Sequence, residues 1–419
     1  MKKPELLSPA GNLEKLKIAL SYGADAVYAS VGAFSLRQRS AKEFSKETFK
    51  EGVEFTHKMG KKFYATINGF PFNAQLDKFK THIEFLKDLG VDAFIIASPS
   101  IINLAKKIAP DTEIHLSTQA NVMNYMDAQI YYDMGVKRVV VAREIGLKDV
   151  IAIKEKVPNL DIEIFIHGSM CFAYSGRCLI SALQSGRFSN RGSCANDCRF
   201  NYEIYAKNDE SGALFKLNED ENGTYIMNSK DLNLSSYVEK IMQSGAVDSF
   251  KIEGRTKSQY YAACATNAYR MAIDDAFSGK FNAEIYQKEL HTLKNRGFTD
   301  GYLVSRPFER KDTQNFNSTL EEGTHQVCAI TLDGEFFDVK FKISKNTPYE
   351  ILAPKNSKIE TIENEIGKIY EKYGKFWLEF KVLKAKNNKE FDEIHSGNLN
   401  QIISPTKLPN FSFLRKEIE

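Results

Sequence analysis

The sequence predicts an α/β fold: a (β/α)₈ barrel of the TIM type followed by a small C-terminal antiparallel β-barrel or sandwich. Two patterns lead to this prediction. A joint in which a helix ends at a glycine and a buried strand begins recurs between Gly23 and Gly245, and after Lys311 the sequence changes to short alternating strands separated by turn residues. At 419 residues the chain is long enough for one large domain and one small one.

The repeated joint has the same design at each occurrence. A helical pattern ends, a glycine follows, and an apolar run begins shortly afterwards. Glycine readily adopts the left-handed conformation that ends many helices, and an unbroken apolar run is typical of a parallel strand buried on both faces. The glycines of these joints are Gly23, Gly90, Gly135 and Gly245.

Helical patterns and further strand candidates fill the intervals between the joints. Strand alternating with helix predicts parallel βαβ units, and about eight strands before residue 255 predict a closed barrel. The alternative is an open doubly wound sheet, but the sequence contains neither a GxGxxG nor a GxxxxGK loop. The strand candidates include residues 5–7, 62–67, 113–117 and 163–167, and the helical patterns include residues 76–89 and 124–134.

The pattern of apolar, polar and turn residues divides the chain into four segments. In the C-terminal part, Val339, Phe341 and Ile343 alternate with lysines, which is the pattern of a strand with one face toward a core. The predicted segments are a barrel (1–311) with a cysteine-rich metal-binding insertion (168–224), a linker (312–324), a small β domain (325–405) and a tail (406–419).

Composition and charge favour a globular, cytoplasmic protein. The N-terminus lacks an apolar region of signal-peptide length, and no apolar stretch approaches the ~20 residues that a membrane-spanning helix needs. We therefore expect no membrane association. The net charge of +3 is only a weak indication of polyanion binding. Six cysteines are too few for a disulfide framework, so clustered cysteines indicate metal or redox chemistry.

Four of the six cysteines lie close together in the sequence, at Cys171, Cys178, Cys194 and Cys198. The spacing of four residues in the second pair places both thiols on one face of a helix, and the spacing of seven in the first pair does nearly the same. Two such pairs can form one tetrahedral thiolate site. Spacing alone leaves zinc and iron–sulfur open, although structural zinc sites usually have tighter Cys-x₂₋₄-Cys pairs. Buried apolar thiols are the remaining interpretation, and it is the one we adopt for Cys264 and Cys328.

Polar residues follow the predicted strands, at the end of a barrel where such enzymes keep their chemistry. Lys251, Glu253 and Arg255 alternate along one extended run and therefore project together. Burying three charges at a barrel mouth costs free energy unless they are paired with each other or bind a ligand. A structural ion-pair network is therefore the alternative to a binding or catalytic role. Arginines there are suited to binding carboxylates or phosphate. The residues that we expect at this mouth are Asn68, Gln119, Arg143, Glu144, His167, Lys251, Glu253 and Arg255.

Several runs of the sequence resemble one known family. The chain contains neither an HExxH nor a GxSxG motif. The run from Glu163 to Cys171, continuing through Gly176-Arg177-Cys178 to Ser181, resembles the signature of the bacterial collagenase-like peptidases of unassigned catalytic type, peptidase family U32. The resemblance extends over nearly the whole chain, through residues 6–11, 225–232 and 251–257, and is greatest to the family branch that hydroxylates tRNA uridines.

The resemblance implies a function that composition and spacing do not. Members of this family are associated with four-iron–four-sulfur clusters and oxygen-independent hydroxylation, which makes the four clustered cysteines the expected cluster ligands. The branch implies prephenate as co-substrate and tRNA as partner, with hydroxylation at C5 of the wobble uridine. Because prephenate is a dicarboxylate, we expect Asn68, Gln119, Arg143, Lys251 and Arg255 to bind substrate and His167 and Glu253 to transfer protons.

Two other functions remain at this point. The first is a collagenase-like metal-dependent peptidase, although four thiolates around one zinc leave no open position for a reacting water. The second is a noncatalytic tRNA-binding protein with a structural zinc.

Overall fold

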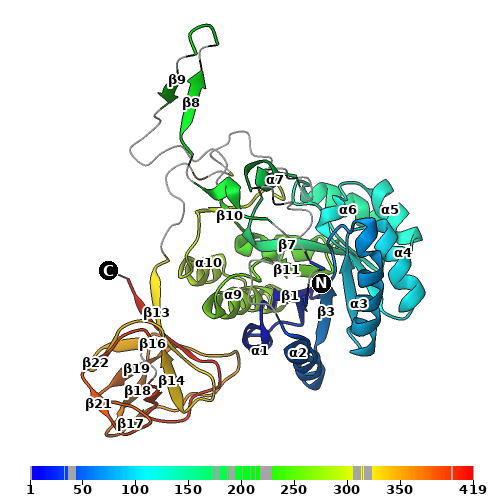
Figure 1. Ribbon diagram of the computed structural model, residues 1–419. Coiled ribbons are helices and arrows are strands. Elements are labelled where there is room, and N and C mark those ends of the chain that lie inside the picture. The colour runs from blue at the N-terminus through cyan, green and yellow to red at the C-terminus, as the bar shows by residue number, and fades with distance from the viewer. Residues whose placement is uncertain are drawn as a thin grey trace.

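The structure is a computed structural model that contains a closed parallel barrel and a separate antiparallel β domain (Figure 1). This confirms the predicted fold class. The structure describes residues 2–32, 34–35, 44–171, 173–174, 178, 180–185, 187, 194–200, 202–207, 209–212, 214–217, 229–304, 313, 315, 323–397 and 400–418. Much of the predicted insertion (168–224) and linker (312–324) therefore lies outside the described residues.

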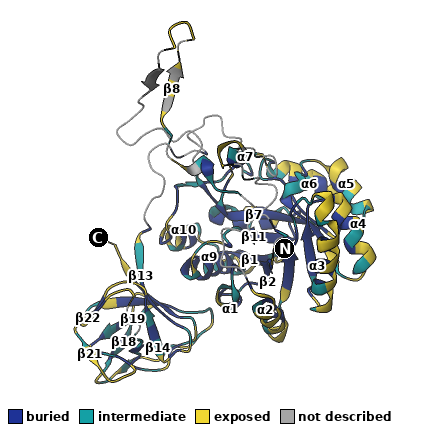
Figure 2. Cartoon of the chain, viewed as in Figure 1, coloured by how far each residue is buried: buried dark blue, intermediate teal, exposed yellow. Residues whose placement is uncertain are grey.

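Eight parallel strands form the barrel, and it closes because the last of them pairs with both the first and the seventh. In barrel order they are β1 (Glu5–Pro9), β2 (Ala26–Ala29), β3 (Lys62–Thr66), β4 (Ala93–Ile96), β5 (Glu113–Leu116), β6 (Arg138–Val140), β7 (Asp161–Ser169) and β11 (Ser249–Ile252). Nearly every residue of these strands is buried (Figure 2), which explains why they appear as continuous apolar runs.

Helices surround the barrel and bury one face each against it (Figure 2). The predicted joints are confirmed, since Gly23, Gly90, Gly135 and Gly245 all have φ between 65° and 104°. The outer helices are α1 (Leu13–Ser21), α2 (Lys46–Lys58), α3 (Leu76–Asp88), α4 (Pro99–Ile108), α5 (Tyr125–Asp133), α6 (Leu147–Lys156), α8 (Val238–Gln243), α9 (Gln259–Ser278) and α10 (Ala283–His291).

Additional elements extend the barrel at the end of β7. Strand β10 (Asp231–Asn233) pairs antiparallel with the end of β7, and β12 (Phe298–Thr299) pairs with β10. Between β7 and β10 lie helix α7 (Ile180–Ser185) and a hairpin of β8 (Ile204–Lys207) and β9 (Leu214–Leu217), which projects away from the barrel in Figure 1. The cysteine-rich segment thus begins where β7 ends.

An eight-stranded antiparallel sheet forms most of the C-terminal domain. Its order is β17 (Ile362–Glu363), β18 (Gly367–Lys372), β19 (Lys375–Phe380), β16 (Pro348–Leu352), β24 (Phe413–Glu417), β13 (His325–Thr331), β14 (Phe336–Val339) and β23 (Ile402–Ile403). Two short pairs complete it: β15 (Ile343–Ser344) with β22 (Glu393–Ile394), and β20 (Leu383–Lys384) with β21 (Glu390–Phe391). Residues 406–419, expected as a tail, instead supply the central strand β24.

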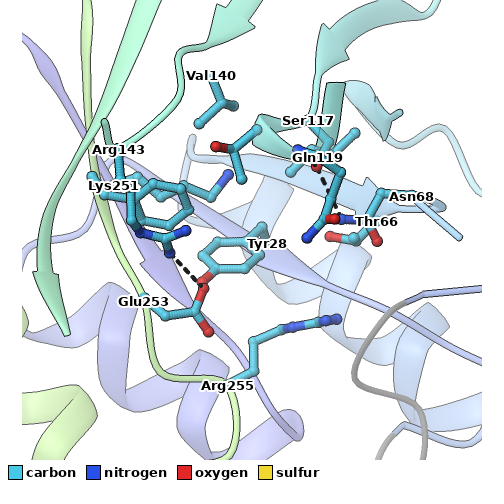
Figure 3. A pocket seen from close by; sticks show the side chains of 13 residues that line it. Tyr28, Thr66, Asn68, Ser117, Gln119, Val140, Arg143, Lys251, Glu253 and Arg255 are labelled. Carbon is cyan, nitrogen blue, oxygen red and sulfur yellow. Dashed lines mark hydrogen bonds and ion pairs between the residues drawn. The ribbon is translucent and has the colours of Figure 1, made fainter. Parts of the chain in front are cut away.

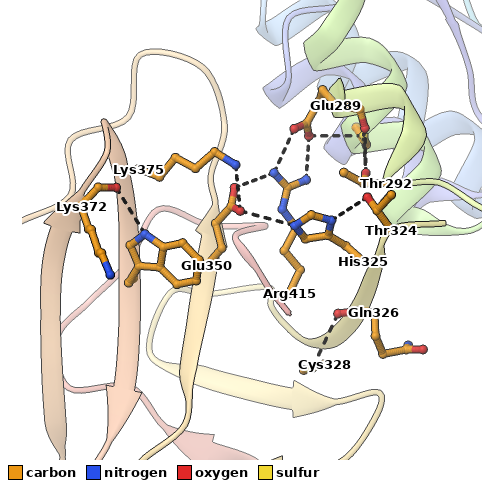
Figure 4. Close-up of polar contacts among 12 residues, drawn as sticks. Glu289, Thr292, Thr324, His325, Gln326, Cys328, Glu350, Lys372, Lys375 and Arg415 are labelled. Carbon is orange, nitrogen blue, oxygen red and sulfur yellow. Dashed lines mark hydrogen bonds and ion pairs between the residues drawn. The ribbon is translucent and has the colours of Figure 1, made fainter. Parts of the chain in front are cut away.

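A buried charge cluster joins the β domain to the barrel (Figure 4). Arg415 of β24 donates two hydrogen bonds, of 2.7 and 2.9 Å, to Glu289 of α10 and a third, of 2.6 Å, to Glu350 of β16. The side chain of Arg415 is 1% exposed. Lys375 and His325 also contact Glu350. Removing one charge from such a cluster leaves the others buried and unpaired, so it holds the two domains in one arrangement.

Candidate active site

A pocket opens at the carboxyl ends of the barrel strands (Figure 3). It is a partly open space bounded by charged, polar and aromatic side chains. Its position is that of the active sites of TIM-type barrels. The pocket is lined by Tyr28, Thr66, Asn68, Ile95, Ser117, Thr118, Gln119, Val140, Arg143, Phe165, Lys251, Glu253 and Arg255.

Most of the expected mouth residues therefore meet in one pocket. The residues that do so are Asn68, Gln119, Arg143, Lys251, Glu253 and Arg255, whereas Glu144 and His167 do not line it. Tyr28, Thr66, Ser117 and Phe165 were missed by the sequence reasoning. Tyr28, Thr66 and Ser117 lie at or directly after the ends of strands, and their only signal is a polar or aromatic side chain there, whereas Phe165 lies in the middle of β7.

Arg143 and Glu253 form one side of the pocket. A guanidinium nitrogen of Arg143 lies 3.9 Å from a carboxylate oxygen of Glu253, and the guanidinium carbon lies 3.6 Å from the centroid of the Phe165 ring. Both charged side chains are only about one-sixth exposed, at 15% and 16%. A long contact of this kind is easily exchanged for a bidentate carboxylate ligand, which the planar guanidinium group fits well.

Lys251 is committed to an ion pair below the pocket. Its ammonium group donates a 2.7 Å hydrogen bond to Glu163, which also accepts a 3.3 Å bond from Arg138. Arg138 is held in turn by Glu5 at 2.6 Å. Burial alone raises the pKa of the Glu163 carboxyl, but Lys251 and Arg138 outweigh it and lower the pKa to about 2. Lys251 thus belongs to a structural ion-pair network, the alternative that the sequence left open.

Arg255 is held by hydroxyl groups. Its guanidinium group donates to Ser30 at 2.6 Å and to Ser35 at 3.4 Å, and the residue is 6% exposed. Its carbonyl oxygen lies where a Cβ at Gly11 would be, only 1.9 Å away, so Gly11 permits this close approach of the two segments. The positively charged side chain of Arg255 therefore lines the pocket in a fixed position.

Neutral polar groups form another part of the wall. The Asn68 amide donates to the Ser117 hydroxyl at 3.0 Å (Figure 3), and the backbone N–H of Gln119 donates to the same oxygen at 3.4 Å. These residues follow β3 and β5, and Ser117 caps the short 3₁₀ helix of residues Thr118–Ala120. This wall can bind uncharged polar groups of a ligand.

His167 lies in a packed aromatic environment outside the pocket. Its register with β11 shifts by one residue at Ile166, which turns His167 to the opposite side of the strand from Phe165. There it contacts the rings of Tyr261, Tyr269 and Phe298 at centroid distances of 5.5–5.7 Å. Burial lowers the pKa of the imidazole to about 4, partly offset by Asp231. Its placement is that of a neutral core histidine.

The clustered cysteines begin two residues beyond β7. The Cys171 and Cys178 thiols are hydrogen-bonded to each other, a contact that raises the pKa of Cys178 together with burial and the nearby Cys198. Cys194 contacts the Ser181 hydroxyl at 3.9 Å. In the described part of the chain, no three His, Cys, Asp or Glu side chains surround one point closely enough to bind a metal ion. Cys264 and Cys328 are buried away from this segment.

A TIM-type barrel with a charged, partly enclosed pocket at the carboxyl ends of its strands has the architecture of a barrel enzyme. The model of one family, described as Peptidase family U32, matches residues 11–313. The chain belongs to this family. Among its described helices, none is both long and apolar enough to cross a lipid bilayer.

Curated relatives resemble the chain over most of its length. The tRNA hydroxylation protein P of Helicobacter pylori (strain ATCC 700392 / 26695) is 58% identical, and the match covers 100% of each chain. The protein of the same name from Escherichia coli (strain K12) is 38% identical, over 88% of this chain and 90% of its own. A collagenase of Porphyromonas gingivalis is 32% identical, over 72% of this chain and 74% of its own.

Proposed function

We propose that this protein is an enzyme that hydroxylates C5 of the wobble uridine in tRNA, in a reaction that depends on prephenate and not on oxygen. The observation that supports this most is the 58% identity, over the whole of both chains, to a protein named for tRNA hydroxylation. A relative at 38% identity with the same name supports it further.

The pocket supports a small dicarboxylate as co-substrate. Arg143 and Arg255 contribute positive charge at its surface, where Arg143 lies 3.9 Å from Glu253, and Lys251 is bound to Glu163 below it. Planar guanidinium groups bind carboxylates well, which favours a ligand that carries carboxylates. Glu253, which lines the pocket beside Arg143, is the residue that we assign to proton transfer, because His167 lies outside the pocket.

We propose Cys171, Cys178, Cys194 and Cys198 as ligands of a four-iron–four-sulfur cluster. The chemistry of the donor set fits, since four thiols follow one another near the end of β7 and the first two are in contact. When bound, such a cluster supplies one-electron chemistry. The first of these thiols, Cys171, comes two residues after β7, so the segment that would hold the cluster begins at the carboxyl end of a barrel strand.

The second candidate function is peptidase activity, which the relative named collagenase favours. A noncatalytic tRNA-binding protein with structural zinc would also use the four cysteines. Neither accounts for a pocket with two arginines at the barrel mouth, which suits a small anion rather than a peptide strand.

Two measurements test the proposed function. In tRNA from a deletion strain, nucleoside mass spectrometry should show the loss of 5-hydroxyuridine derivatives, and the wild-type gene should restore them only in cells that make prephenate. Unchanged nucleosides would exclude the function. Protein purified anaerobically should contain iron and sulfide, whereas a colourless, zinc-loaded protein that cleaves collagen would favour the peptidase.

A further inference from the structure

The neutral wall of the pocket contains buried polar atoms that the protein itself does not satisfy. Thr66 is 4% exposed. Among the described residues, neither its hydroxyl oxygen nor the buried amide oxygen of Gln119 has a hydrogen-bond partner. Both residues line the pocket. Buried polar atoms are nearly always paired with protein, water or a ligand, so these two atoms in the pocket mark positions where a polar group binds.

The available groups on this wall include both a donor and acceptors. The Ser117 oxygen already accepts two hydrogen bonds, from Asn68 and from the backbone of Gln119, so its own proton can be donated to a ligand. The Gln119 amide oxygen can only accept, and the Thr66 hydroxyl can do either. A ligand hydroxyl, which donates one hydrogen bond and accepts others, satisfies all three.

The barrel topology places Thr66 across from Phe165, whereas Gln119 and Arg143 follow the neighbouring strands β5 and β6. In the closed order β1-β2-β3-β4-β5-β6-β7-β11, three strands separate β3 from β7 in either direction. Thr66 ends β3 and Phe165 belongs to β7. Figure 3 shows Arg143 and Lys251 on one side of the pocket, Gln119 and Asn68 on the other, and the Tyr28 ring between them.

We propose that Thr66 and Gln119 select the ligand of this pocket by binding a hydroxyl group on a ring whose carboxylate lies at Arg143. The inference rests on the proposed function, since prephenate carries its hydroxyl on the ring carbon opposite the one that bears its carboxylate groups. The ring then lies over Tyr28 and Phe165, and each polar end of the ligand meets the wall that matches it.

Two simple keto acids can test the contribution of the hydroxyl group to binding. 4-Hydroxyphenylpyruvate and phenylpyruvate have the same carboxylate and ring and differ only in the hydroxyl opposite the side chain. Calorimetric binding to the full-length protein, purified anaerobically, should favour the hydroxylated acid by roughly tenfold, since a site built around a hydrogen bond discriminates against the ligand that lacks it. Thr66→Val and Gln119→Leu should each reduce this preference, and together abolish it, with phenylpyruvate affinity unchanged.

Matched variants separate this effect from damage to the fold. Thr66→Ser keeps the hydroxyl and should keep the preference. Thr56→Val removes a buried threonine hydroxyl in α2, which does not line the pocket. This hydroxyl donates a 2.7 Å hydrogen bond to the Gly52 carbonyl, and its loss should also leave the preference intact. A preference that survives the double Thr66→Val, Gln119→Leu change overturns the proposal. The proposal is also overturned if the double variant loses binding of uridine 5′-monophosphate while its affinities for the two acids are unchanged. The wall would then bind the edge of a base and not the hydroxyl of a small acid.

The outcome is independent of the modification assay. If tRNA nucleosides are unchanged in the deletion strain but the preference for the hydroxylated acid holds, the proposed function fails and the pocket assignment stands. If the wild-type protein binds both acids equally or neither, the assignment fails whatever the tRNA result.

Discussion

The ammonium group of Lys251 and the carboxylate of Glu163 lie 2.7 Å apart inside the barrel, and their side chains are only 5% and 1% exposed. This pair forms the floor of the pocket and connects through Arg138 to Glu5 at the opposite end of the strands. The charges in the barrel are therefore mutually dependent, and changing one alters the support of the site above it.

Loss of one partner from this pair should be strongly destabilising. Lys251→Met leaves Glu163 buried with less compensation, so we expect the free energy of unfolding to fall by about 3–5 kcal/mol. Lys342→Met is the matched control, since its ion pair with Glu393 is nearly half exposed and removing it should change the free energy of unfolding far less. Urea unfolding measures both, and equal losses would contradict the description of Lys251 as part of the structural network.

Stability should decrease between neutral and acidic pH in part because of His167. Its folded pKa is lowered to about 4 by burial, below the ~6.5 of an exposed histidine. The unfolded chain therefore binds the proton more readily, so this contribution is fully present above about pH 6.5 and is lost as the pH falls toward 4. His167→Phe should flatten the pH dependence of urea unfolding in that interval.

His82 provides an independent check, because burial also lowers its pKa to about 4. His82→Phe should flatten the same interval, and the effects of the two changes should add. An unchanged slope in the His167→Phe protein would contradict its placement as a buried neutral histidine. Retained tRNA hydroxylation in that variant would also exclude it as an acid or base in the reaction.

Arg143 and Glu253 should have opposite effects on ligand binding. Arg143→Gln removes the cation at the rim of the pocket and should weaken prephenate binding by about 10- to 100-fold, as expected for a charged hydrogen bond worth ~1.5–3 kcal/mol. Arg143→Lys should recover only part of this, because it cannot bind a carboxylate in the same bidentate way. Glu253→Gln should keep or increase the affinity, measured by calorimetry, while lowering turnover.

Cluster content should depend on position and not merely on the number of cysteines. Cys171→Ser should lose most of the iron and sulfide of the anaerobically purified protein. Cys264→Ser is the control, since this buried thiol of α9 contacts Glu289 and Thr292 far along the chain from the four clustered cysteines. Full iron content in both variants would remove Cys171 from the ligand set.

Gly168 should tolerate no side chain. Its φ is +107°, and a Cβ there would lie 2.5 Å from the Glu253 carbonyl oxygen and 2.8 Å from the Tyr261 hydroxyl. Gly168→Ala should therefore displace the Glu253 segment and lower both stability and activity. Gly90→Ala has φ +70° but nothing within 4 Å, and should cost only the ~1–2 kcal/mol of the left-handed conformation. Equal losses would show that space at Gly168 is not limiting.

The barrel follows from the sequence because its signals are local. Each joint glycine marks a helix end and each apolar run a strand, and the alternation of Lys251, Glu253 and Arg255 places all three at one pocket. His167 could not be oriented in this way, because the register shift at Ile166 depends on pairing with β11, far along the chain. The partner of Lys251 is hidden for the same reason, since Glu163 lies on another strand.

The pairing of β24 also has a consequence for how the β domain is made. During synthesis β13 and β16 emerge long before Phe413, yet each pairs with β24 and not with the other. One edge of each strand therefore stays unpaired until β24 has been synthesised and inserts between them. Pairing between strands so far apart in the sequence is slow to form. Arg415 arrives on the same strand, so closure of this sheet and docking onto α10 should occur as one event.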